Sequence, residues 1–78
     1  MPRKEPSSDE IEAIVAVLKQ IRQENNFSIE GMARLLGFSG AHLSMIFAGK
    51  RRPGLRFLRA AARRFPQVRR HLIRSLYK

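Results

Sequence analysis

With 78 residues, 44% of them hydrophobic, the chain can form one small domain around a single core, and the absence of cysteine excludes disulfide frameworks, thiolate catalysis and Cys-based zinc sites. The formal net charge is +10; all six acidic residues lie between Glu5 and Glu30, whereas Gly31 to Lys78 carries twelve Lys or Arg and no acidic residue. Because a half-chain with this charge repels itself, we expect a polyanionic partner, with nucleic acid ahead of anionic lipid; a merely solvated basic surface is the alternative.

Residues 1–7 contain two prolines and mixed charge and are predicted to form a flexible N-terminal arm. Arg3 and Lys4 could contact a DNA groove or phosphate from this arm, although a disordered arm is the simpler interpretation. The start of the chain lacks the apolar run of a signal peptide, and no segment approaches a membrane span. We therefore expect a cytoplasmic, nucleoid-associated protein without membrane contact, whose residues 8–78 form a single domain.

The first helix is predicted to begin at Ser7-Ser8, because Ser7 and Glu10 have the spacing of a capping box and acidic residues fill the first turn. It is expected to end at Asn25-Asn26. Five apolar residues at helical spacing mark one face as scaffold: Ile11, Ile14, Val15, Leu18 and Ile21.

A second, shorter helix is predicted over residues 29–36. Ser28 can cap its first turn, and Phe27 precedes this cap at the spacing of a hydrophobic staple with Met32. Gly37 follows the last helical residue, where the chain often needs a left-handed conformation.

The same signals then recur. Ser39 can cap a third helix over residues 40–48, and Gly49 follows it as a second stop signal. Leu43 and Ile46 are three residues apart on this helix, so we expect both to face inward. Two short helices joined by a tight glycine turn constitute a helix-turn-helix.

As a set, these features resemble the lambda-repressor-like (Cro/Xre-type) helix-turn-helix DNA-binding domain, with the motif at residues 28–48. The matching residues are Met32-Ala33, Leu36-Gly37-Phe38, Ser39, Leu43, Ile46 and Gly49-Lys50-Arg51-Arg52-Pro53. The resemblance implies an all-α fold, double-stranded DNA as partner, and the role of a small transcriptional regulator rather than an enzyme, with no cofactor or metal.

A fourth helix is predicted over residues 55–64, with these residues inward: Leu55, Leu58, Ala61 and Ala62. Phe65 precedes a proline, which disfavours helical geometry, so the helix is expected to stop there. Pro66 suits the first turn of a fifth helix, which carries Val68, Leu72, Ile73 and Leu76. Five helices around one core are therefore expected.

The resemblance places the helix at residues 40–48 in the major groove of DNA. The candidate base contacts are Ser39, Gly40, Ala41, Ser44 and Met45. Such positions commonly carry Gln, Asn, Arg or Lys, whereas Ser44 offers one undemanding hydrogen bond and Ala41 and Met45 offer only apolar contact. Direct readout of bases is therefore expected to be modest, unless DNA shape or the arm adds to it.

Candidate phosphate contacts come from the helix N-termini and from the cations around the motif: Ser28, Arg34, His42, Lys50, Arg51 and Arg52. Seven later arginines could widen this footprint, hold an acidic partner or be plain surface: Arg56, Arg59, Arg63, Arg64, Arg69, Arg70 and Arg74. Neither His42 nor His71 has an acidic residue near it in the sequence, so no catalytic or metal role is expected.

The last helix carries more apolar residues than one core-facing stripe needs: Leu72, Ile73, Leu76 and Tyr77. They could form a homodimer contact, which would space two groove helices about 34 Å apart, or they could simply close the core. Two other functions also fit the sequence. One is a protein-interaction or antitoxin-like adaptor that binds an acidic protein, and the other is a non-specific basic nucleic-acid-binding protein.

Overall fold

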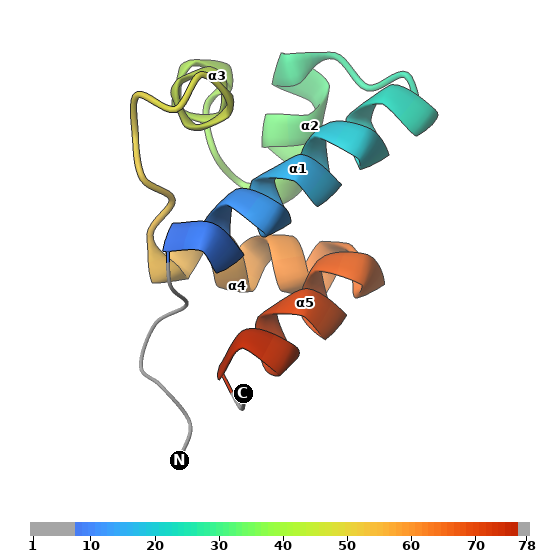
Figure 1. Cartoon of the computed structure of the whole chain (residues 1–78). Helices are drawn as coiled ribbons and strands as arrows, with labels where there is room; N and C mark the ends of the chain where they lie inside the picture. The colour runs from blue at the N-terminus through green and yellow to red at the C-terminus, as the bar shows by residue number, and fades with distance from the viewer. Residues whose placement is uncertain (1–7, 77–78) are drawn as a thin grey trace.

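The structure, a computed structural model, describes residues 8–76, with the side chains of residues 8–74 (Figure 1). The described residues form five helices: α1 Ser8–Glu24, α2 Ile29–Leu36, α3 Gly40–Phe47, α4 Leu55–Arg64 and α5 Pro66–Leu76. The expected all-α architecture is confirmed, and α3 ends one residue earlier than predicted, with Ala48 as its C-cap. The predicted arm at residues 1–7, with Arg3, Lys4 and the capping Ser7, lies outside the described residues.

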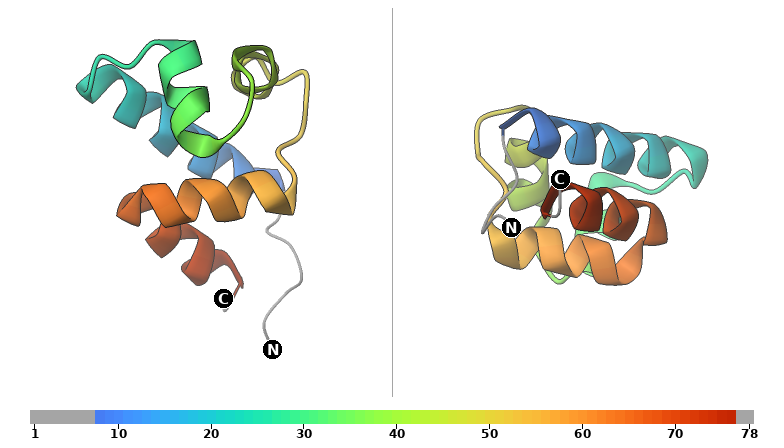
Figure 2. Two further views of the ribbon diagram at one scale, coloured as in Figure 1. Left: turned by 180° about the vertical axis from the view of Figure 1, so that it is seen from behind. Right: turned by 60° about the horizontal axis from the view of Figure 1, so that its bottom comes forward.

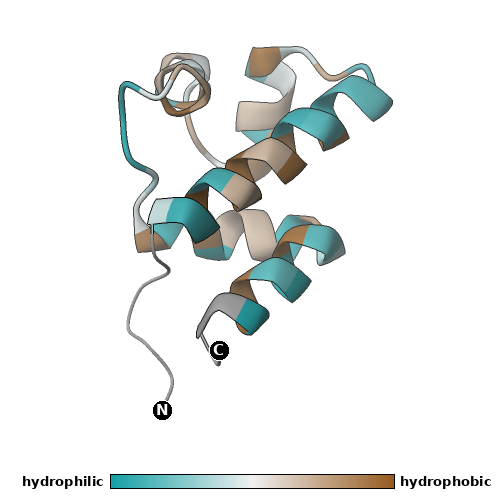
Figure 3. Cartoon of the chain, viewed as in Figure 1, coloured by the Kyte–Doolittle hydropathy of each residue, from teal (hydrophilic) through white to brown (hydrophobic). Residues whose placement is uncertain are grey.

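One apolar cluster, to which all five helices contribute, forms the core. Its buried members are Ile11, Ile14, Leu18, Ile21, Met32, Ala33, Leu36, Leu43, Ile46, Phe57, Leu58, Ala61, Val68 and Leu72. Figure 3 shows hydrophilic colour along the outer sides of α1 and α5 and hydrophobic colour where the helices face one another. The predicted stripe on α1 is confirmed, although Val15 is only partly buried. Burial of this stripe anchors α1 in the core, where it packs on α3 and α5.

The helices are arranged so that α3 lies at an edge of the molecule. In Figure 1, α1 crosses the middle, with α2 and α3 above it and α4 and α5 below. α2 packs on both α3 and α4, while α1 packs on α3 and α5. The view from behind in Figure 2 shows α4 crossing in front of the other helices. α3 is therefore attached to the body through one side only.

α1 ends at its asparagine pair, as predicted. Asn26 has a φ of 55°, in the left-handed region that asparagine tolerates better than most residues. The Nδ2 amide of Asn25 donates to the carbonyl of Ile21 at 2.9 Å, and the N–H of Phe27 donates to the carbonyl of Arg22 at 3.0 Å. These bonds satisfy carbonyls that the end of the helix leaves free.

The break between α4 and α5 also lies where the sequence predicts it. Phe65 has φ −124° and ψ 111°, an extended conformation of the kind imposed on a residue before proline. Its N–H still closes α4 by donating to the carbonyl of Ala61 at 2.9 Å, and its carbonyl accepts from the N–H of Val68 at 3.0 Å. α5 begins at Pro66, where the missing N–H is not needed.

The inward face of α4 differs in part from the prediction. Leu58 and Ala61 are buried, but Leu55 and Ala62 are only partly buried. The largest buried side chain on this helix is Phe57, which is 1% exposed and which the prediction missed. The reason is the rotation of α4 about its own axis. The buried stripe runs through Phe57, Leu58 and Ala61, so Leu55 and Ala62 are turned toward the edges of the core.

α5 contributes less free apolar surface than the sequence suggested. Leu72 is 7% exposed and closes the core, so its proposed place in a homodimer contact is wrong. Ile73 is 52% exposed, while the side chains of Leu76 and Tyr77 lie outside the described residues. Within residues 8–76, no helix combines the length and apolar character needed to cross a membrane.

Candidate nucleic-acid interface

The turn between α2 and α3 is set by Gly37. Its φ of 78° lies in the left-handed region, where the absence of a Cβ removes the steric penalty. Its N–H donates to the carbonyl of Arg34 at 3.1 Å, and the N–H of Phe38 donates to the carbonyl of Ala33 at 2.9 Å. The predicted glycine turn is confirmed, and it satisfies the last carbonyls of α2 while it redirects the chain into α3.

Both motif helices begin at a serine cap. The Oγ of Ser28 accepts from the N–H of Gly31 at 2.9 Å, and the Oγ of Ser39 accepts from the N–H of His42 at 3.1 Å. Both serines are exposed and have extended backbone conformations. Each hydroxyl keeps its proton, so each cap can also donate a hydrogen bond to an external acceptor such as a phosphate oxygen.

α3 divides into a buried side and an exposed side. Leu43 is completely buried and Ile46 is 3% exposed, as predicted. On the opposite side Ala41 and Ser44 are exposed, and Met45 is 42% exposed. Met45 therefore presents apolar surface to solvent on this side of α3.

Gly40 differs from the other candidate base contacts, because it is partly covered. A Cβ placed on Gly40 would lie 2.8 Å from Cγ of Glu30, so the acidic side chain occupies the space beside the first turn of α3. No role for Glu30 was expected from the sequence. Two features of the sequence could have pointed to this contact: Gly40 at the start of a helix, and Glu30 as the only acidic residue of the motif. Their proximity, however, depends on how α2 and α3 cross.

The ring of His42 packs against aromatic neighbours, and its expected contact with phosphate stays a prediction. Its ring centroid lies 4.8 Å from that of Phe38 and 6.1 Å from that of Phe57, to which it is stacked at 9°. The two phenylalanine rings are themselves 5.2 Å apart, edge to face. This Phe38–His42–Phe57 cluster joins the turn, α3 and α4, and it fixes α3 on the body.

The basic loop after α3 is anchored to the end of that helix. Lys50 and Arg51 donate their N–H groups to the carbonyl of Met45 at 2.9 and 3.2 Å. Gly49, with a φ of 75°, provides the left-handed turn that this path requires. The side chains of Lys50 and Arg51 are exposed, and Arg51 also lines a cavity that this loop forms with α1. The backbone of the basic loop thus continues directly from the last turn of α3.

Arg52 is directed elsewhere. Its Nη1 donates to the Oγ of Ser8, at the start of α1, at a distance of 3.4 Å. A cavity of about 640 Å³ lies between α1 and this loop, and within it the Nζ of Lys19 lies 5.9 Å from the centroid of the Phe47 ring. The loop is therefore positioned from both sides, by α3 and by α1.

Comparison with protein families identifies this arrangement. A model of the helix-turn-helix family HTH_3, the Cro/C1 type, matches residues 18–70. The chain belongs to this helix-turn-helix family. Comparison with curated proteins and with solved structures gave no match. The resemblance drawn from the sequence is confirmed, and the chain is a DNA-binding helix-turn-helix domain.

The charge of this helix-turn-helix domain is distributed to suit a polyanion, with one exception. Arg34, on the last turn of α2, is exposed and adds to the cations of the loop. Among the described residues after α1, Glu30 is the one acidic side chain. It lies between the N-termini of α2 and α3, which are the places where backbone N–H groups favour an anion. The carboxylate therefore opposes phosphate at the point where the helix dipoles attract it.

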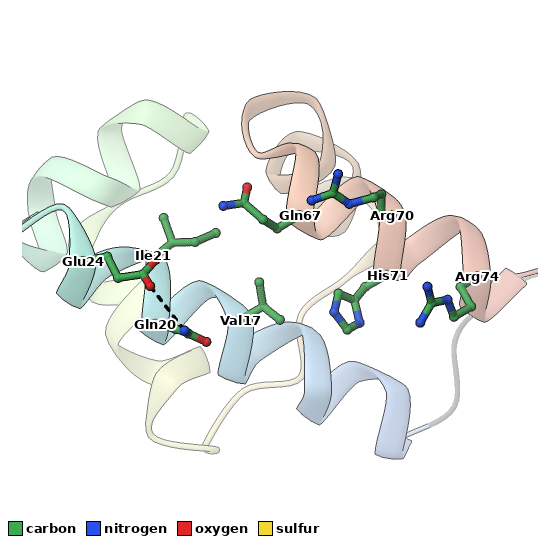
Figure 4. A pocket seen from close by; sticks show the side chains of 8 residues that line it. All are labelled: Val17, Gln20, Ile21, Glu24, Gln67, Arg70, His71 and Arg74. Carbon is green, nitrogen blue, oxygen red and sulfur yellow. Dashed lines mark hydrogen bonds between the residues drawn. The ribbon is translucent and has the colours of Figure 1, made fainter.

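A second cavity of the helix-turn-helix domain lies away from α3, between α1 and α5 (Figure 4). It has a volume of about 380 Å³ and is lined from α5 by Gln67, Arg70, His71 and Arg74. On the α1 side the Nε2 of Gln20 donates to Oε2 of Glu24 at 3.3 Å. Among the residues that line this cavity, Glu24 is the one with an acidic side chain.

Proposed function

We propose that this domain acts on DNA in the cytoplasm as a small transcriptional regulator of the Cro/Xre type, with α3 in the major groove. The observation that carries the proposal is the two-sided character of α3. Leu43 and Ile46 attach it to the core, and the opposite side is exposed at Ala41, Ser44 and Met45. A helix held by one face with its other face free fits the width of a major groove.

Base readout on this surface is limited by its chemistry. Ala41 and Met45 can contact the methyl group of thymine, and the hydroxyl of Ser44 can bond to either a donor or an acceptor. The carboxylate of Glu30 can accept from the N4 amine of cytosine, which is a more selective contact. We therefore expect a modest preference for sequence, carried by few positions.

Affinity comes mainly from the phosphate backbone. The exposed side chains of Lys50, Arg51 and Arg34 lie around α3, and the capped N-termini at Ser28 and Ser39 offer hydroxyl and backbone donors. Arg52, which already has Ser8 as a partner, is expected to contribute less than its two neighbours. Each neutralised phosphate steepens the salt dependence by about 0.9 in log–log slope.

Fluorescence anisotropy with a random-sequence duplex over a salt series tests the loop. We expect Lys50→Ala/Arg51→Ala to weaken binding and to lower the salt slope by about 1.8, because two phosphate contacts are lost. The matched control is Arg69→Ala/Arg74→Ala on α5, which removes the same charge. A slope that stays the same in the loop variant, or falls equally in the control, contradicts this docking.

The same assay tests the groove helix through Met45→Asp. The new carboxylate would lie in the groove, so we expect at least a tenfold loss of affinity, on the order of the 1–3 kcal/mol of a single groove contact. Ala13→Asp, on the exposed side of α1, makes the same charge change away from the proposed surface. Equal losses in both variants would show that only net charge matters.

Non-specific binding is the second candidate, and it is favoured by the lack of paired donors and acceptors on α3. Selection from a random duplex library at two salt concentrations separates the two functions. A regulator enriches a common sequence, more strongly at the higher salt, whereas a non-specific binder enriches none. An adaptor for an acidic protein would bind neither duplex pool in a salt-dependent way.

A homodimer through α5 would now depend on Ile73. Its 52% exposed side chain is flanked by the exposed Arg70 and Arg74, which would repel their copies across a two-fold contact. We therefore expect a weak dimer that salt strengthens by screening. Sedimentation at micromolar concentration in low and high salt tests this, with Ile73→Asp as the disrupting variant; a monomer under both conditions rejects the dimer.

A further inference from the structure

The outer side of α4 carries charge that the helix-turn-helix surface does not use. Successive residues of a helix turn by about 100°, so the buried residues Phe57, Leu58 and Ala61 fix which side of α4 faces inward. The opposite side is occupied by three exposed arginines, here called the α4 arginine ridge: Arg56, Arg59 and Arg63. The outer face of this helix is therefore formed entirely by one type of cation.

Nothing in the described part of the chain balances this ridge. Among residues 8–74, whose side chains the structure describes, no hydrogen bond or ion pair joins any of the three guanidinium groups to another residue. Arg59 and Arg63 are four residues apart and Arg56 and Arg59 three apart, spacings at which like charges destabilise a helix. No Asp or Glu follows Glu30 in the chain, and Glu30 itself lies against Gly40 on α3. The charge of the ridge is therefore uncompensated within the described part of the chain.

The ridge points away from the groove helix. α4 packs on α2 and α5, and α3 lies toward the inner side of α4, where the ring of His42 is stacked on that of the buried Phe57. In the view from behind in Figure 2, α4 crosses the lower half of the molecule in front of the other helices, and α3 lies above it. A duplex that accommodates α3 would therefore leave the outer face of α4 free.

We propose that the α4 arginine ridge binds the phosphate backbone of a second DNA duplex, so that one domain bridges two segments. The inference rests on the proposed binding of a first duplex by α3. Arg56 and Arg63 are about 10 Å apart along the helix axis, which is about the rise of three base pairs along the axis of a duplex. Guanidinium groups bind phosphate oxygens with two parallel hydrogen bonds, and a row of them follows a strand without reading its bases.

A sandwich assay tests bridging with the full chain. One random-sequence duplex is fixed on beads, and retention of a second, fluorescent duplex is measured as protein is added. We expect wild type to retain the second duplex, and Arg56→Gln/Arg59→Gln/Arg63→Gln to lose that retention while it still saturates the first duplex. The affinity for the second duplex should fall with salt concentration with a log–log slope of about 2.7, because the ridge makes three phosphate contacts of about 0.9 each.

The control is Arg64→Gln/Arg69→Gln/Arg74→Gln, which removes the same charge outside the ridge and is expected to keep the retention. Equal loss in both triple variants, or retention by the ridge variant, overturns the proposal. If wild type binds the fixed duplex but retains no second one, bridging is wrong and the groove function stands; if it binds no duplex, both fail. Polyglutamate and unlabelled duplex are then compared as competitors of the second duplex. If polyglutamate releases the second duplex at a lower concentration of negative charge than unlabelled duplex does, the ridge is assigned to an acidic protein instead.

Discussion

Gly40 has no side chain, and Glu30 occupies the space where one would lie, 2.8 Å from a Cβ at that position. This single contact brings a carboxylate to the first turn of the helix that we place in the groove. A carboxylate there repels every phosphate equally. In the major groove it can accept a hydrogen bond from the N4 amine of cytosine, which is the one base whose amine has no acceptor beside it. We therefore expect Glu30 to lower affinity for DNA in general and to increase the difference in affinity between a preferred and a non-preferred site.

We expect Glu30→Gln to strengthen binding to a random-sequence duplex several-fold and to reduce the affinity ratio between selected and random duplexes. The reason is that the amide keeps the shape of the side chain and removes its charge. Anisotropy titrations on both duplexes measure the two effects. Glu12→Gln, on the exposed side of α1, is the matched control, and an unchanged ratio in Glu30→Gln would reject a selective role.

His42 shows why residue type alone does not assign a role. Its position on the third helix suggested a phosphate contact, but its ring is stacked 6.1 Å from Phe57, a residue fifteen positions later in the chain. A ring held between two phenylalanines has little freedom to reach outward. The packing of this ring connects α3 to α4, and a phosphate contact by His42 stays a prediction.

At the scale of elements, the motif depends on short-range hydrogen bonds at the ends of its helices. α2 and α3 have only eight residues each, too few to be stable alone in water. Their caps and the core contacts together keep them folded, so loss of one cap should destabilise the whole motif.

We expect Ser39→Ala to lower the free energy of unfolding by about 1 kcal/mol, because the N–H of His42 loses its acceptor. Ser44→Ala is the matched control: it makes the same chemical change at an exposed position inside α3, where alanine is the better helix former. Urea denaturation followed by circular dichroism measures both. A Ser39→Ala variant as stable as Ser44→Ala would show that the cap contributes nothing.

Much of this local structure could be predicted because its causes lie within a few residues. Ser28, Ser39, Gly37 and the Phe65-Pro66 step each act on neighbouring backbone groups, so their effects can be read directly along the chain. The role of Phe57 could not be predicted in this way. Its burial depends on how far α4 is rotated about its own axis, and that rotation is set by contacts with α2 and α5.

At the scale of the whole molecule, the dominant feature is a separation of charge along the chain. The acidic residues end at Glu30, and the positive charge of everything after it is uncompensated within the sequence. Folding brings these cations closer together, which lowers stability until a polyanion or salt screens them. DNA binding and stability are therefore expected to respond to salt in opposite directions.

We expect salt to raise the thermal midpoint of the free domain, because the Debye length falls from about 10 Å at 0.1 M to about 3 Å at 1 M. Arg59→Glu should raise the midpoint at low salt, since the new carboxylate can pair with Arg63 four residues later and Arg56 three residues earlier, by a few tenths of a kcal/mol for each pair. Arg59→Gln is the control that only removes charge. Differential scanning calorimetry of the three proteins across a salt series measures this, and a midpoint independent of salt would contradict the self-repulsion.

The sequence by itself determined the five helices, the glycine turn and the family, because caps, prolines and apolar periodicity act over short stretches of chain. Only the tertiary structure decided which side chains share a surface: Glu30 with Gly40, His42 with Phe57, and the separation of buried Leu72 from exposed Ile73. These outcomes depend on the angles at which helices cross and on their rotation about their axes. Both are fixed by packing between residues far apart in sequence, which no local pattern records.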